Sequence, residues 1–256
     1  MIDIAREVIK IAQKAGEAIL EIYEESEGVV IERKADDSPL TIADKAANKI
    51  ICDGLEKLSV SYPIISEENK EIPYDIRKDF EYNWLVDPLD GTKEFIKRNG
   101  EFTVNIALIK NGRPVIGVVY APVLNEMYWA VKGEGAFLIK EGKETKLSAS
   151  EFRMSDSNLR VVCSRSHLNQ GTQDFVDALT KPELVSKGSS LKFLILAKGE
   201  AELYPRLAPT MEWDSGAADI VLEEAGGKVI DEETKESLRY NKENLLNPFF
   251  IAYGKV

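Results

Sequence analysis

Apolar side chains recur every three or four residues near the start of the chain, which is the spacing of one helical face. This pattern predicts an amphipathic helix over residues 3–25, and a second helix is expected from Thr41 to about Leu58. Residues 34–39 lie between them and are rich in charged residues, Ser and Pro, so they are expected to form a turn or loop.

The middle of the chain changes to the alternating pattern of half-buried strands. Strands are expected at residues 63–66, 102–109, 115–120, 126–131 and 136–139. The dipeptide Asn111-Gly112 is a strong signal for a tight hairpin turn. Consecutive hairpins predict a mostly antiparallel sheet.

The last hundred residues alternate between strand and helix patterns, as layered α/β units do. Residues 140–158 are polar and contain several Ser residues, so a seam between two subdomains is expected there. The predicted organisation is an N-terminal α+β subdomain over 1–150 and a C-terminal α/β subdomain over 151–256.

The stretch from Trp84 to Thr92 carries the most chemical information. Three apolar residues are typical of the end of a buried strand, and Pro88 predicts that the strand stops there. Asp87 and Asp90 would then lie on a tight turn before a short helix. Carboxylate oxygens suit Mg²⁺, and free N–H groups at a helix start suit a phosphate. The combination indicates metal-assisted hydrolysis of a phosphate ester, with a surface Asx-type turn as the ordinary alternative.

Three further acids also follow a predicted strand or begin a predicted helix: Asp44, Glu67 and Asp214. Each has an ordinary explanation. Asp44 could be the capping-box partner of Thr41, and any one of these acids could be a helix cap or a solvated charge. Sequence spacing does not show whether these acids converge.

Composition narrows the class of protein. The chain has 256 residues and a formal net charge of −11, which argues against general binding to nucleic acid or to a membrane surface. It does not exclude an anionic substrate, because bound metals can invert the local field. The two cysteines suggest no disulfide framework. Without an apolar leader or a membrane-length run, a cytoplasmic location is expected.

Three motifs resemble the signatures of the inositol monophosphatase-like superfamily. They are Ser66-Glu67-Glu68, the Asp87–Thr92 turn and the Glu212–Ala218 segment, and they occur in the expected order. The resemblance implies an α+β fold, a layered α/β/α/β/α sandwich of the inositol monophosphatase and fructose bisphosphatase type. It also implies a Mg²⁺-dependent, lithium-sensitive phosphatase.

The resemblance also implies roles for individual residues. The carboxylates of Glu67, Asp87, Asp90 and Asp214 and the backbone carbonyl of Leu89 would hold Mg²⁺. Three residues would be catalytic: Asp44, Glu67 and Thr92. Asp44 and Thr92 resemble the pair that orients and deprotonates the attacking water. The N–H groups of Gly91 and Thr92 would hold the phosphate.

The substrate is indicated by segments that resemble the 3′(2′),5′-bisphosphate nucleotidase branch of the superfamily: 84–109, 164–167, 188–193 and 204–206. This implies hydrolysis of adenosine 3′(2′),5′-bisphosphate to AMP and phosphate. The implied substrate contacts, each of which could instead be a solvated or capping side chain, are Ser164, His167, Ser189, Lys192 and Arg206. Ser215 departs from the Thr expected there, but it keeps a hydroxyl.

Other functions remain open at this point. Inositol 1-phosphate is an alternative substrate, and fructose 1,6-bisphosphate is a further one. A non-enzymatic role, as a metal-dependent partner or an RNA-binding accessory, is the rival from another class, but all the expected acids are present. The expected partner is a small phosphate ester, and the chain could be a monomer or a homodimer.

Overall fold

The computed structural model of the chain describes residues 1–24, 32–33, 39–40, 42–163 and 169–256. The described helices are α1 Ile2–Glu24, α2 Ile42–Leu55, α3 Tyr74–Arg77, α4 Thr92–Ile96, α5 Gln170–Asp177, α6 Leu191–Ala197 and α7 Glu212–Glu224. The strands are β1 Glu32–Arg33, β2 Pro39–Leu40, β3 Ile64–Ser66, β4 Tyr82–Asp90, β5 Thr103–Lys110, β6 Arg113–Ala121, β7 Glu126–Val131, β8 Gly135–Lys140, β9 Lys143–Lys146, β10 Arg160–Cys163, β11 Glu183–Ser186, β12 Leu203–Arg206, β13 Lys228–Asp231 and β14 Phe250–Tyr253.

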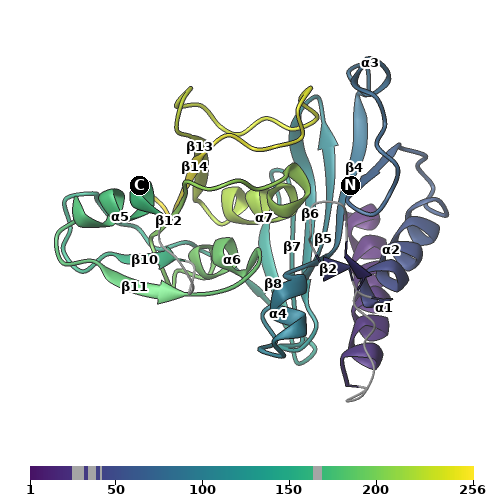
Figure 1. Cartoon of the computed structure of the whole chain (residues 1–256), viewed down its shortest axis with the longest axis horizontal. Coiled ribbons are helices and arrows are strands. Elements are labelled where there is room, and N and C mark those ends of the chain that lie inside the picture. Colours follow the sequence, from purple (N-terminus) through teal and green to yellow (C-terminus); the bar gives the residue numbers. More distant parts are fainter. Residues whose placement is uncertain (25–31, 34–38, 41, 164–168) are drawn as a thin grey trace.

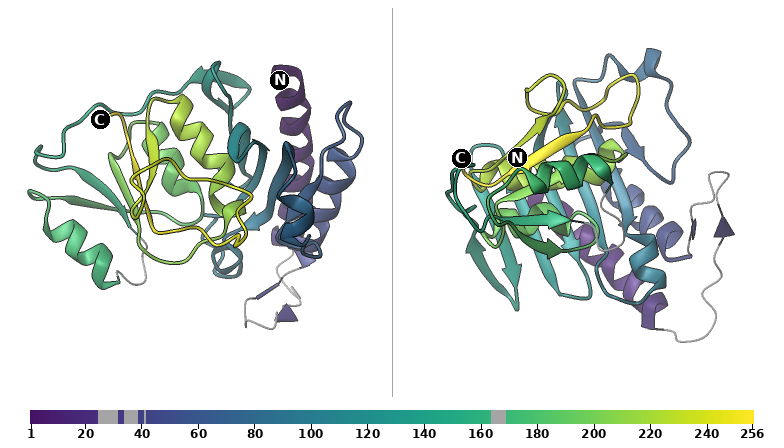
Figure 2. Two further views of the ribbon diagram at one scale, coloured as in Figure 1. Left: turned by 90° about the horizontal axis from the view of Figure 1, so that it is seen from above. Right: turned by 60° about the vertical axis from the view of Figure 1, so that its left-hand side comes forward.

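The elements form five layers, as Figure 1 shows from right to left. Helices α1 and α2 cover one face of a seven-stranded sheet with the order β3-β4-β5-β6-β7-β8-β9. Helices α6 and α7 lie on its other face, next to a five-stranded sheet with the order β11-β10-β12-β14-β13. Helix α5 covers the far side of that second sheet (Figures 1 and 2). The predicted α+β sandwich is confirmed.

Alternation along the central strands explains the layers. On β5, Val104, Ile106 and Leu108 pack into the core under α1 and α2, whereas Ala107 and Ile109 face the core shared with α6 and α7. Successive side chains of a strand point to opposite faces, so one apolar strand supplies two cores. The seven-stranded sheet is antiparallel apart from the β3–β4 pair, as predicted.

The turn between β5 and β6 also follows its sequence signal. Asn111 and Gly112 have φ values of 49° and 76°. Positive φ at both central residues is what a type I′ hairpin turn requires, and Asn-Gly adopts it at little cost. The local sequence therefore specifies the two-residue turn that joins β5 to β6.

Strand β4 corrects the prediction that Pro88 ends it, because β4 runs on to Asp90. Two features allow this. Strand β3 pairs only with Trp84–Val86, so Pro88 lies beyond its partner on that side. On the other side the register shifts: Asp87 pairs with Asn105 and Asp90 pairs with Thr103, so three steps on β4 oppose two on β5. Such a bulge tolerates a proline and re-aims the side chains beside it.

Two other expectations need adjustment. The polar stretch after residue 140 contains strand β9, which was not predicted. The seven-stranded sheet ends at residue 146 and the five-stranded sheet begins at residue 160, so the division into 1–150 and 151–256 stays a prediction that the strand order supports. Residues 25–31, 34–38, 41 and 164–168 lie outside the described residues, and with them the capping role of Thr41 and the loop after Lys34.

Candidate active site

The bulge at the end of β4 places two carboxylates at the start of α4. Asp87 is buried, and its Oδ1 accepts a hydrogen bond from the N–H of Leu89 at 3.1 Å. Gly91 follows with φ of 96°, a value that favours glycine, and Thr92 begins α4. The Thr92 hydroxyl donates to the carbonyl of Leu89 over 3.4 Å. The bond from the Leu89 N–H to Asp87 is of the Asx type, so that part of the turn interpretation is correct.

The predicted acids lie close to Asp87. Burial raises the pKa of Asp87 well above its ordinary value, and the carboxylates of Glu67, Asp90, Asp214 and Asp44 raise it further. These four come from the end of β3, the end of β4, the first turn of α7 and the first turn of α2. The fold thus gathers acids that are up to 170 residues apart, from Asp44 to Asp214.

Asp214 has two functions in this arrangement. Its Oδ2 accepts a hydrogen bond from the N–H of Met211 at 2.9 Å, which caps α7. Burial, Asp90 and Glu67 raise its pKa to about 7, while the Met211 bond and Arg206 act in the opposite direction. The capping explanation for an acid at a helix start is correct here, and the acid still faces the cluster.

The donor set fits divalent cations. Buried carboxylates that repel one another are costly unless a cation is shared between them. Within the described part of the chain, no three Asp, Glu, His or Cys side chains are already placed to hold one metal ion, so binding would require the carboxylates to turn. Asp90 Oδ2 accepts bonds from the Ser189 hydroxyl at 2.5 Å and the Ser190 N–H at 2.6 Å. Because Asp90 and Asp214 both bond through Oδ2, their Oδ1 atoms are the ones that can turn to a cation.

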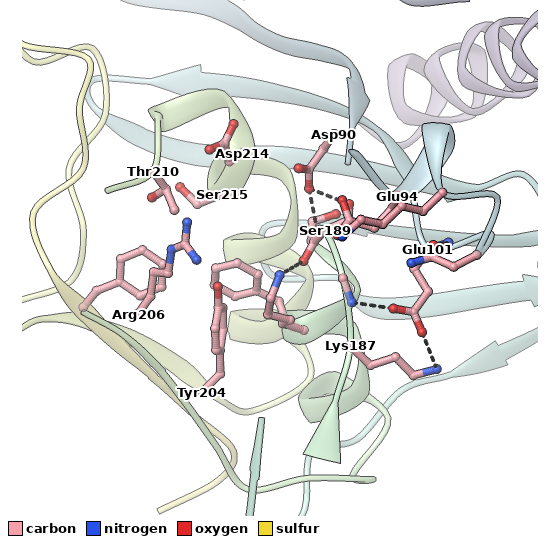
Figure 3. A pocket seen from close by; sticks show the side chains of 17 residues that line it. Asp90, Glu94, Glu101, Lys187, Ser189, Tyr204, Arg206, Thr210, Asp214 and Ser215 are labelled. Carbon is pink, nitrogen blue, oxygen red and sulfur yellow. Dashed lines mark hydrogen bonds and ion pairs between the residues drawn. The ribbon is translucent and has the colours of Figure 1, made fainter. Parts of the chain in front are cut away.

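A cavity of about 460 Å³ opens beside this cluster (Figure 3). Asp90 and Asp214 line one side, and Arg206 from β12 projects from another. Tyr204 from β12 lines it too, with Phe193 and Phe250, whose rings pack against one another. A cavity with acids, cations and aromatic rings has the volume and chemistry for a small organic phosphate.

A hydroxyl network that sequence reasoning missed holds the segment 187–190 against the sheet. Thr103 Oγ1 lies 2.6 Å from Ser189 Oγ and 2.7 Å from Ser190 Oγ, and the Ser190 hydroxyl donates to Asn105 Oδ1 at 2.7 Å. Glu101 accepts the N–H of Gly188 at 2.9 Å. The signal was available: Thr103 and Asn105 are polar residues at alternate positions of an otherwise apolar strand.

Two predicted substrate contacts, Lys192 and Arg206, reach the cavity. The ammonium of Lys192 donates to the carbonyl of Ser189 at 2.6 Å and lies 5.6 Å from the centre of the Tyr204 ring. Arg206 Nη2 donates to the carbonyl of Pro209 at 2.7 Å, and its buried Nε–H has no hydrogen-bond partner among the described residues. Ser189 also lines the cavity, whereas Ser164 and His167 lie outside the described residues.

Comparisons with known proteins agree with this arrangement. A sequence model of the Inositol monophosphatase family matches residues 3–249. The chain is 44% identical over 245 residues to proteins named 3′(2′),5′-bisphosphate nucleotidase CysQ from Salmonella typhimurium and from Escherichia coli K12. Each alignment covers 95% of this chain and 97% of the relative.

Solved structures show the same fold. The crystal structure of CysQ from Bacteroides thetaiotaomicron, described as a bacterial member of the inositol monophosphatase family, superposes with a TM-score of 0.86 at 43% identity. That superposition covers 99% of this chain and 98% of the other. An inositol monophosphatase from Thermotoga maritima superposes with a TM-score of 0.76 at 26% identity, covering 96% of this chain and 89% of the other. This chain therefore belongs to the inositol monophosphatase family.

Proposed function

We propose that the chain is a Mg²⁺-dependent phosphatase that hydrolyses the 3′(2′)-phosphate of adenosine 3′(2′),5′-bisphosphate to AMP and phosphate. The carrying observation is the cavity, which Asp90 and Asp214 line together with four cationic side chains, among them Lys192 and Arg206. A substrate with one phosphate at each end matches that distribution of charge. The curated relatives at 44% identity carry the name of this activity.

The acids are assigned to the reacting phosphate. The carboxylates of Glu67, Asp87, Asp90 and Asp214, with the carbonyl of Leu89, are proposed to hold Mg²⁺. The bound ions would neutralise the charge of the ester and make an attacking water more acidic. Asp44, oriented with the Thr92 hydroxyl, accepts the proton of that water, and the N–H groups of Gly91 and Thr92 hold the phosphate oxygens. The water oxygen bonds to phosphorus as the ester P–O bond breaks, the leaving nucleoside oxygen takes up a proton from solvent, and Asp44 then releases its proton to solvent.

The cationic side of the cavity is assigned to the second phosphate. The planar guanidinium of Arg206 can bind two phosphate oxygens, and its buried Nε–H needs such a partner. Lys192 also lines this side, whereas the Ser189 hydroxyl donates to Asp90 and lies on the acidic side, so its contact with substrate stays a prediction. Contacts from Ser164 and His167 stay predictions. Lithium sensitivity, a cytoplasmic location and a monomeric or homodimeric state also stay predictions. Among the described residues, no helix is both long and apolar enough to cross a bilayer.

Phosphate release from a substrate panel tests the proposed activity. With Mg²⁺, adenosine 3′,5′-bisphosphate should be hydrolysed far faster than inositol 1-phosphate or fructose 1,6-bisphosphate, with AMP as the nucleotide product. Chelation with EDTA should stop the reaction. Comparable rates for the three substrates, or a preference for inositol 1-phosphate, would favour the inositol monophosphatase alternative. No release from any of them would favour the non-enzymatic role.

The raised pKa of Asp214 predicts how Mg²⁺ affects thermal unfolding. Its carboxyl titrates near 3.8 in the unfolded chain and at about 7 in the folded one. Stability contributed by the protonated form is therefore complete below 3.8 and is lost as the pH rises through about 7. Added Mg²⁺ binds the ionised form, so it should raise the unfolding temperature by several degrees more at about pH 8 than at about pH 5.5.

Differential scanning calorimetry in EDTA and in Mg²⁺ at both pH values measures this difference. Asp219, whose pKa burial raises to about 7 outside the cluster, contributes equally in EDTA and in Mg²⁺ and cancels, whereas the raised pKa of Asp87 adds to the expected difference. An increase with Mg²⁺ that is the same at the two pH values would show that proton release from the cluster does not accompany metal binding.

A further inference from the structure

Arg77 is a buried arginine whose guanidinium joins two distant segments of the chain. It lies on α3, shortly after Glu67 along the chain, and only 1% of its surface is exposed. Its Nε donates to the carbonyl of Ile72 at 3.2 Å, within its own segment. Arginine is seldom buried so completely unless its donors are used.

The other donors of Arg77 hold residues 241–243. Nη1 donates to Asn241 Oδ1 at 3.1 Å and to the carbonyl of Lys242, and Nη2 donates to the carbonyl of Glu243 at 2.7 Å. In return, the Asn241 amide donates to the carbonyl of Arg77 at 2.6 Å. Because the planar guanidinium fixes several acceptors at once, it orients this segment as well as attaching it.

A second buried side chain, Glu212, binds the same segment from the opposite side. Its carboxylate accepts the N–H of Asn241 at 2.5 Å, the N–H of Lys242 at 3.1 Å and the Lys242 ammonium. Glu212 is fully buried and is the first residue of α7, two residues before Asp214. Segment 241–243 is therefore held between the Glu67 side of the site and the Asp214 side.

A cavity of about 300 Å³ separates parts of these two sides, and its lining includes Glu67, Ile72, Trp213, Glu243 and Leu245. Strand β3, which ends just before Glu67, has three residues and, among the described strands, pairs with β4 alone. Hydrogen bonds run without a break from Arg77 to segment 241–243 and from that segment to Glu212, so they connect the Glu67 side of the site to the Asp214 side.

We propose that Arg77 is a positioning residue: through segment 241–243 and Glu212 it sets the separation of Glu67 from Asp214, and thereby the affinity of the acidic cluster for divalent cations. This inference rests on the proposed metal site. Arg77 touches neither substrate nor cation. Its loss should therefore weaken metal binding, while turnover recovers when the metal is saturating.

The test compares Arg77→Lys with Arg113→Lys. Arg113 also joins distant segments, through the carbonyl of Leu238 and through Glu223 at 2.6 Å, but it holds the C-terminal half of α7. Both variants keep the positive charge and lose the guanidinium. Direct Mn²⁺ binding, measured by electron paramagnetic resonance of the free ion, should be about 10–100-fold weaker in Arg77→Lys, the range typical of lost supporting contacts. In Arg113→Lys it should change less than about twofold, whatever the loss of thermal stability.

Activity provides a second readout. The Mg²⁺ concentration for half-maximal phosphate release should rise with the Mn²⁺ dissociation constant in Arg77→Lys, and kcat at saturating Mg²⁺ should stay within about threefold of wild type. Equal Mn²⁺ affinity in Arg77→Lys and wild type would overturn the inference. So would equal weakening in Arg77→Lys and Arg113→Lys, because metal binding would then follow general stability.

A milder variant covers the case in which Arg77→Lys does not fold. Asn241 has φ of 60°, so Asn241→Gly keeps the backbone conformation and removes both side-chain bonds to Arg77. Its Mn²⁺ affinity should fall by about 3–10-fold, as expected for one lost supporting group. Unchanged affinity would overturn the inference. If wild type itself binds no Mn²⁺, the metal site fails first and the role of Arg77 fails with it.

Discussion

Replacing Asp90 with asparagine is expected to lower kcat/KM for adenosine 3′,5′-bisphosphate by about 10³-fold or more, because metal-based charge stabilisation contributes several kcal/mol. The substitution removes a negative charge that the proposed cation would share with Glu67, Asp87 and Asp214. The fold should persist, since the asparagine carbonyl can still accept the bonds from Ser189 and Ser190. Phosphate release and thermal unfolding are measured on the same preparations.

Asp53→Asn is the matched control for this substitution. Asp53 lies on α2, where it pairs with Lys49 at 2.7 Å on the surface, so the same chemical change should leave turnover within about twofold. If Asp90→Asn retained normal activity at ordinary Mg²⁺ concentrations, Asp90 would not be a metal ligand. If it lost activity only by unfolding, its role would be structural.

Replacing Arg206 with methionine is expected to remove most of the preference for a second phosphate. Wild type should hydrolyse adenosine 3′,5′-bisphosphate about 10–100-fold more efficiently than 3′-AMP, because a charge-assisted bidentate contact contributes about 1.5–3 kcal/mol. The two substrates share the reacting phosphate and differ in the 5′-phosphate. In Arg206→Met, kcat/KM for the bisphosphate should fall most of the way to the value for 3′-AMP, because Lys192 still faces the 5′-phosphate, while kcat/KM for 3′-AMP changes little.

The comparison separates two roles for Arg206. Arg206 lowers the pKa of Asp214, so it could also act on the metal cluster. In that case Arg206→Met would lower kcat/KM equally for both substrates, and the assignment to the second phosphate would be wrong. Arg153→Met, at an exposed arginine, should leave both values unchanged within about twofold.

The parts of the fold that could be predicted from the sequence depend on local patterns. Helix α1 follows from apolar spacing, and the β5–β6 hairpin follows from Asn111-Gly112, because both are specified by neighbouring residues. The resemblance added the layer order and pointed to the acids. Their positions near Asp87 agree with it, while their roles as ligands stay a proposal.

Other features depended on contacts between distant segments. Pro88 appeared to end β4 because a proline cannot join a regular ladder, and only the short β3 and the bulge opposite Asn105 explain why the strand continues. Arg77 was missed because its partners in segment 241–243 are 164 or more residues away in sequence. A single charged residue in a polar segment gives no sign that it will be buried.

The most direct test of the acidic cluster is a crystal structure of the protein soaked in Mn²⁺, with anomalous scattering used to locate the ions. The account predicts anomalous peaks within about 2.0–2.4 Å of carboxylate oxygens of Glu67, Asp87, Asp90 and Asp214, the range for hard divalent cations. Peaks at other places only, in crystals of enzyme that Mn²⁺ activates in solution, would contradict it.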